Sequence, residues 1–153
     1  MRTFIRLQRM MAGAALLSAL AAASYGDGAL AGGESFTATA TELHQITGFP
    51  IEIHATAVIA KDPSLPLICR TIVNGFRDAA TNPETDRWLG QIVHVVVIEG
   101  SSAGKQTSHV DLKEKVLTIH TMTGEAEINN LRLLIAETLR KVAHLKAEQH
   151  PVK

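Results

Sequence analysis

The residues best suited to chemistry are histidines in segments expected to form strands. His54, His94 and His120 all lie in such segments. Three imidazoles that meet on one sheet face could hold a zinc ion and leave its fourth position open to water. No pair of them has the short spacing along the chain that zinc motifs show, and His94 lies among valines, as a hydrogen-bonded core histidine would. We therefore predict no metal site and no bound cofactor.

Hydrolysis is an alternative use of the same histidines. His54, His94 or His120 could act as a general base together with Glu99 or Asp111. Such a site requires that at least two of these side chains meet in one pocket. A small secreted hydrolase, with a site assembled from dispersed His and Asp or Glu residues, is therefore the alternative function.

Two further motifs imitate functional sites. Ser108, His109 and Asp111 are the residue types of a catalytic triad, but neighbours along a strand point to opposite faces of a sheet. The stretch Gly100–Lys105 resembles a phosphate loop, yet only three residues separate its glycines, and Gln106 stands where magnesium binding needs Ser or Thr. We predict a hairpin-like connection there and no nucleotide site.

A helix expected over Ile128–Leu145 must position any contact surface near the end of the chain. The side opposite its apolar stripe carries Leu133, Glu137, Arg140 and His144. We take these four residues as the candidate interaction face for a protein or peptide partner or for a second copy. The alternative for Glu137 and Arg140 is a solvated ion pair at helical spacing. The apolar stripe itself recurs every three or four residues and consists of Ile128, Leu131, Ile135, Leu139 and Val142.

Part of this helix carries a family resemblance. The segment Leu133–Arg140, LLIAETLR, is similar in its apolar framing to the active-site helix of zincin metallopeptidases, in which Glu-x-x separates two histidines. The order of elements over residues 64–145 also resembles that of small zincin domains. Glu137 matches the general base, but Ala136 and Arg140 stand where the zinc-binding histidines belong. The resemblance therefore implies a degenerate zincin-like domain, a pseudo-enzyme that binds peptides along a strand edge without cutting them.

The single cysteine lies in a second expected helix. Leu65–Ala80 has helical apolar spacing, with Ser64 or Asp62 as its cap and Pro66 in its first turn. Cys69 falls in the apolar stripe, so we predict a small buried hydrophobic residue and not a nucleophile. One cysteine also excludes a disulfide within the chain.

The remaining elements follow from alternation and breakers. Strands are expected over Ile51–Ala60, over Gln91–Glu99 and over Val116–Thr121, the second of them central and covered on both faces because it is apolar almost throughout. Thr81–Gly90 is expected to be a polar turn, with Trp88 and its neighbour closing one end of the core. The resulting order is β-α-β-β-α. It predicts an α/β (α+β) fold in which a small mixed β-sheet packs against two amphipathic helices. Residues 49–147 would form this single domain, and 148–153 a C-terminal tail.

The first residues have the pattern of a secretory signal peptide. Three arginines and no acid precede an uncharged apolar run over 11–23, which is too short to span a bilayer. Cleavage motifs occur at 21–23 and at 29–31, so the signal peptide covers 1–23 or extends to 31. An uncleaved membrane anchor is the alternative. Residues 24–48, rich in Gly, Ser, Thr and Ala, are expected to form a flexible leader.

Charge excludes some classes of partner. Loss of the three arginines takes the basic count from 15 to 12, against 14 or 15 acids, so the mature chain is mildly acidic. We therefore expect no nucleic acid partner and no membrane association after signal removal. The expected protein is an exported, non-catalytic α/β domain that acts in binding or assembly in the periplasm or outside the cell.

Overall fold

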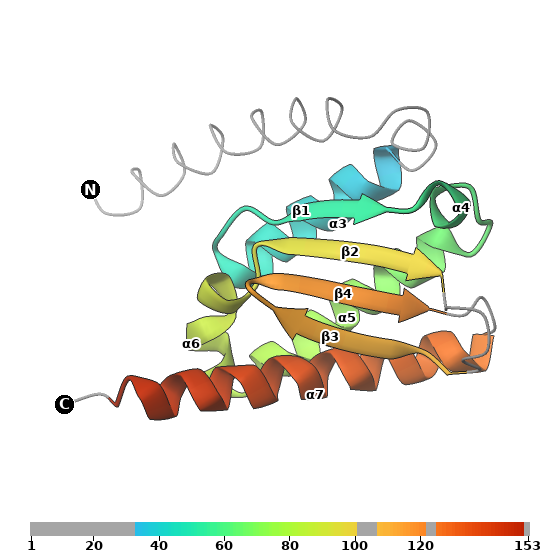
Figure 1. Ribbon diagram of the computed structural model, residues 1–153. Coiled ribbons are helices and arrows are strands. Elements are labelled where there is room, and N and C mark those ends of the chain that lie inside the picture. Colours follow the sequence, from blue (N-terminus) through green and yellow to red (C-terminus); the bar gives the residue numbers. More distant parts are fainter. Residues whose placement is uncertain (1–32, 101–106, 122–124, 152–153) are drawn as a thin grey trace, which may run out of the picture.

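The fold combines a mixed sheet with helices, as the sequence predicts. A computed structural model describes residues 33–100, 107–121 and 125–151 (Figure 1). Its four-stranded sheet packs against helices, notably α3 and α5, which confirms the α/β class. The elements in chain order are α3 (Gly33–Thr47), β1 (Glu52–Ala55), α4 (Ala57–Ala60), α5 (Leu65–Ala80), α6 (Pro83–Ile92), β2 (Val95–Gly100), β3 (His109–Lys113), β4 (Val116–Thr121) and α7 (Glu125–Gln149).

The strand order in space is β1-β2-β4-β3, with β1, β2 and β4 parallel and β3 antiparallel to β4. The hairpin-like connection expected after β2 is therefore wrong. β2 and β3 are not neighbours, because the chain crosses to the edge strand β3 and returns by a tight turn at Glu114 and Lys115 to place β4 in between. Residues 101–106, which hold most of the glycine loop, lie outside the described residues.

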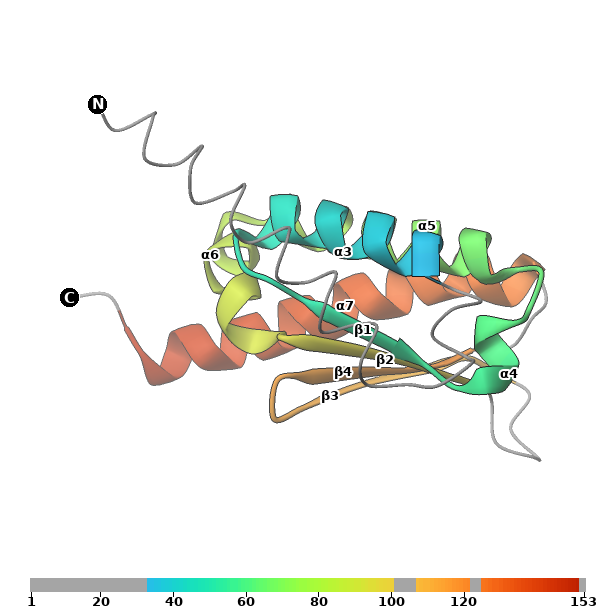
Figure 2. The ribbon, with the colours of Figure 1, turned by 90° about the horizontal axis from the view of Figure 1, so that it is seen from above.

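The molecule has two layers, with α3, α5 and α7 on one side of the sheet (Figure 2). The second expected strand, β2, lies inside the sheet. The expectation that it is covered on both faces is wrong. Val96 and Ile98 are fully buried under the helices, but Val95 and Val97 point the other way and are only half-buried. The sheet thus has one core face, which is formed by Ile53, Val96, Ile98, Val110, Leu117 and Ile119.

The two expected helices form the centre of the core. α5 has the predicted bounds, and Ser64 is its N-cap residue, although the Ser64 side chain makes no capping hydrogen bond. The Asp62 carboxylate accepts a hydrogen bond from the Ser64 N–H at 2.8 Å, just before the helix begins. Close approach of α5 to α7 depends on Gly75, because a Cβ there would lie 2.8 Å from Cγ2 of Ile135. α7 is longer than predicted, so residues 148 and 149 are helical and the expected tail over 148–153 is wrong at its start.

The leader expected over 24–48 is wrong for residues 33–47, which form α3. Its buried residues Phe36, Thr39, Leu43 and Thr47 have helical spacing, but two of them are threonines and do not register as an apolar stripe. Each of these threonines satisfies its hydroxyl by donating to the carbonyl four residues earlier. The signal peptide and both cleavage motifs lie outside the described residues.

Two short helices replace expected strand and turn. The strand expected over 51–60 ends at Ala55, and 57–60 form α4. The turn expected over 81–90 is mostly α6, which begins with Pro83 and is capped by the Asn82 side chain, an acceptor for two backbone N–H groups. Trp88 and Leu89 on α6 are buried, which confirms that they close one end of the core.

Candidate functional site

The helices α3, α5 and α7 leave the opposite face of the sheet uncovered (Figure 2). We name it the open face. Its side chains alternate along each strand with those of the core face. It consists of Glu52 and His54 on β1, Val95, Val97 and Glu99 on β2, Val116, Thr118 and His120 on β4, and His109, Asp111 and Lys113 on β3.

Strand register arranges these residues in three rows across the sheet. The first row is Glu52, Val95, Val116 and Lys113, and the second is His54, Val97, Thr118 and Asp111. The third row joins Glu99, His120 and His109. Three valines therefore occupy the middle of the open face, and ionisable side chains surround them.

Ionisable groups on the open face form local pairs. Nε2 of His54 lies 3.2 Å from Oε2 of Glu52, and Nδ1 of His120 lies 3.3 Å from Oε2 of Glu99. The rings of His109 and His120 stack with centroids 6.1 Å apart and planes 22° apart. The polar border of the face is thus held by one contact within β1 and by contacts between neighbouring strands at β2, β4 and β3.

The three histidines considered for zinc do not converge. His54 lies on β1 in the second row, and His120 lies on β4 in the third, with β2 between them. His94 precedes the first row at the opposite end of β2 and is exposed, so the expected core position for it is wrong. Within residues 33–100, 107–121 and 125–151, no cluster of three or more His, Cys, Asp or Glu residues could hold a metal ion.

Of the groups considered for hydrolysis, the structure brings together only His120 and Glu99. His54 and Asp111 occupy one row but opposite edge strands, which places them about 14 Å apart. Ser108 is buried while His109 is exposed, as expected for neighbours on a strand. The backbone N–H of Ser108 donates to Oε2 of Glu127 at 3.0 Å, so it ties β3 to α7.

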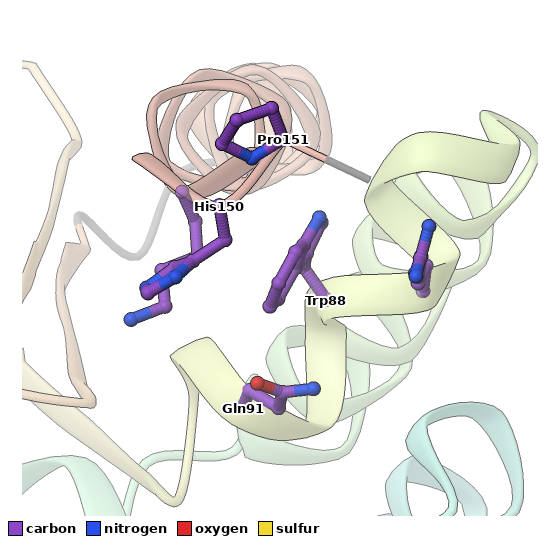
Figure 3. Close-up of a pocket in the computed structure, with 6 residues that line it drawn as sticks. Trp88, Gln91, His150 and Pro151 are labelled. Carbon is purple, nitrogen blue, oxygen red and sulfur yellow. The ribbon is translucent and has the colours of Figure 1, made fainter. Parts of the chain in front are cut away.

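A hollow of about 390 Å³ opens between α6 and the end of α7 (Figure 3). The Trp88 ring forms one wall. Its centroid lies 6.0 Å from the centroid of the His150 ring and 5.8 Å from the guanidinium carbon of Arg87. Gln91, Lys146 and Pro151 complete the lining. Its donors suit a small anion, although the negative end of the α7 dipole lies beside it. No candidate residue predicted from the sequence lines this hollow.

The four residues of the predicted α7 interaction face are all exposed, Leu133 to 59%. Two of them also hold the molecule together. The Arg140 side chain is held by Asp78 and not by Glu137, because its Nη2 donates to the carbonyl oxygen of Asp78 at 2.7 Å. Nδ1 of His144 lies 3.0 Å from Oε1 of Glu84 on α6. These contacts fix the polar part of the face and leave Leu133 projecting from it.

Ion pairs between the helices shift the pKa values of His144 and Asp78. The hydrogen bond that His144 donates to the Glu84 carboxylate, followed by the charges of Glu148 and Glu84, raises the pKa of His144 above 6.5. Arg132 donates to both carboxylate oxygens of Asp78, to Oδ1 at 2.8 Å, and so holds the pKa of Asp78 below 3.8. α7 is therefore clamped to α5 and α6 by charge as well as by packing.

Cys69 is a buried residue of the core, as predicted. Burial raises the pKa of its thiol, which opposes formation of the nucleophilic thiolate. Among the zincin-like positions, Ala136 is buried while Glu137 and Arg140 face outward. An alanine and an arginine offer no zinc ligand at either position.

In comparisons with known proteins, no family model, no curated sequence and no solved structure matches the chain. None of the helices described in the structure is long and apolar enough to cross a membrane.

Sequence reasoning missed the open face as a surface. The sequence feature that indicates this surface is the alternation of buried and partly exposed residues along β4, in which Val116, Thr118 and His120 share one side. In β2 the valine run conceals the same alternation, because both of its faces are apolar. Only the placement of the helices tells which face of the run is covered.

Proposed function

We propose that this chain is an exported, non-catalytic domain that binds a protein partner through the open face. Export rests on the basic and apolar pattern of the first 23 residues. Binding rests on the geometry of the sheet. The degenerate zincin resemblance is compatible with this role, since a domain without zinc ligands retains only its contact surfaces.

The observation that carries the proposal is an apolar face on parallel strands that the described helices do not cover. Sheets of parallel strands are normally covered on both faces, and β1, β2 and β4 are parallel. Here the described helices cover one face only, and Val95, Val97 and Val116 occupy the middle of the other. An apolar centre with a polar border is the anatomy of a protein interface.

The α7 interaction face supports a second contact surface. Leu133 projects from the same side of α7 as Arg140 and His144, whose side chains are already fixed by Asp78 and Glu84. Binding of a partner over Leu133 would therefore cost little side-chain entropy in the Arg140 and His144 part of the face. The hydrolase alternative rests on the His120–Glu99 pair alone, which lies on the open face and not in the hollow of Figure 3.

Site-specific photo-crosslinking in the exporting cell tests the proposal. A photoreactive amino acid at position 97 lies in the middle of the open face, and one at position 70 on α5 serves as the exposed control outside both contact surfaces. We expect an adduct of higher mass from position 97 and none from position 70. Absence of an adduct at position 97 would contradict the proposal.

A further inference from the structure

We infer that the partner of the open face is the open face of a second copy of this chain. This inference rests on the proposed function and names the partner for that same surface. Its basis is the order of residues within the three rows, which makes the face complementary to itself.

The geometry is that of a twofold axis parallel to the strands, between β2 and β4. Such an axis lays each row of one copy over the same row of the other in reversed order. In the first row, Glu52 then faces Lys113 of the second copy, and Val95 faces Val116 of the second copy. An acid meets a base at each edge, and valines meet in the middle.

The other rows have the same complementarity. In the second row, His54 faces Asp111 of the second copy, and Val97 faces Thr118. In the third row, Glu99 faces His120 of the second copy. Two sheets packed in this way lie about 10 Å apart with their strands nearly aligned, a separation that the long Glu and Lys side chains span together.

The order of the residues within each row distinguishes this arrangement from a chance apolar patch. If Lys113 and Glu52 carried the same charge, the twofold axis would place like charges together at both edges. Instead, the pairings described above join valine with valine or threonine, lysine with glutamate, and histidine with a carboxylate. The helix layers of both copies stay on the outside, so the dimer would be a four-layer sandwich of helix, sheet, sheet and helix.

The size of the open face determines how stable we expect the dimer to be. Strands about 4.8 Å apart and about five residues long give a footprint of roughly 19 Å by 16 Å. This is smaller than the roughly 800 Å² per partner of a standard stable interface. We therefore expect a dimer that dissociates on dilution.

Charge reversal with rescue tests the inference on the full exported chain. Sedimentation equilibrium over a dilution series should give a mass that rises from monomer to dimer. Glu52→Lys and Lys113→Glu should each weaken the dimer roughly tenfold, because the twofold axis repeats each lost pair. The double variant should regain the affinity of the wild type, whereas Lys141→Glu on α7 should change nothing. The two edge residues lie about 14 Å apart within one copy, so rescue reports a contact between copies.

The outcomes separate this inference from the proposed function. A wild-type chain that stays monomeric at all concentrations, or a double variant that does not recover, overturns the inference. If position 97 still crosslinks to a different protein, the proposed function holds and only the identity of the partner is wrong. If position 97 gives no adduct, both are wrong.

Discussion

Val96 and Val97 are consecutive residues of β2, yet Val96 is fully buried beneath the helices and Val97 lies half-buried on the open face. Truncation should therefore have unequal costs. We expect Val96→Ala to lower the free energy of unfolding of the dilute monomer by about 2 kcal/mol, and Val97→Ala by less than about 1 kcal/mol. Urea unfolding checks both variants. Equal losses would mean that both faces of β2 are core.

Close packing of α5 on α7 makes Gly75 sensitive to any side chain. The Cβ of Gly75→Ala would lie 2.9 Å from Cβ of Ile135 and 3.2 Å from the carbonyl oxygen of Arg132. Overpacking of this kind costs about 1–3 kcal/mol, which exceeds the gain of about 1 kcal/mol in helix propensity. Thermal unfolding should show a net loss of stability. Gly33→Ala is the matched control, because its added Cβ meets nothing within 4 Å.

The turn between β3 and β4 holds strain that a substitution can relieve. Glu114 and Lys115 have φ values of 51° and 67°, the left-handed region that two-residue hairpins require and that favours Asn and Gly. Lys115→Gly should raise the free energy of unfolding by up to about 1 kcal/mol. Lys113→Gly, in the adjoining strand, should lower it instead. A destabilised Lys115→Gly variant would show that the side chain of Lys115 is needed.

His144 should make stability depend on pH. Its folded-state pKa is raised by Glu84 and Glu148, so the protonated imidazolium stabilises the folded state. This contribution is fully present below the unfolded pKa of about 6.5 and is lost as pH rises through the higher folded value. The stability difference between wild type and His144→Gln should be largest near about pH 5 and absent near about pH 9. Chemical denaturation at several pH values measures it, and a difference independent of pH would contradict the ion pair.

The helices that could be predicted from the sequence are those whose buried positions carry large apolar side chains. The stripes of α5 and α7 follow the helical period in Ile, Leu and Phe, so both helices were expected near their true positions. The apolar pattern does not predict α3, because threonines fill two of its buried positions. It does not predict α6 either, because Asn82 and Pro83, which cap and begin this helix, are equally typical of a turn. Local patterns carry this information only when the buried residues are distinctly apolar.

The pairing of strands, and with it the candidate site, could not be predicted. Alternation along β4 indicates two different faces, but nothing in it states that β4 lies between β2 and β3. The rows that oppose Glu52 to Lys113 exist only once this order is known. The valine run of β2 suits a strand covered on one face or on both, because its composition is the same in either case.

The central claim is that the open face is covered in the working protein, and thiol labelling of Val97→Cys tests it most directly. The native thiol of Cys69 is buried with a raised pKa and should remain silent on the native protein. We predict that Cys at position 97 reacts more slowly with a maleimide in the exporting cell's own compartment than in dilute purified protein, while Arg70→Cys on α5 reacts equally fast in both. Equal rates for position 97 in the two settings would contradict the account.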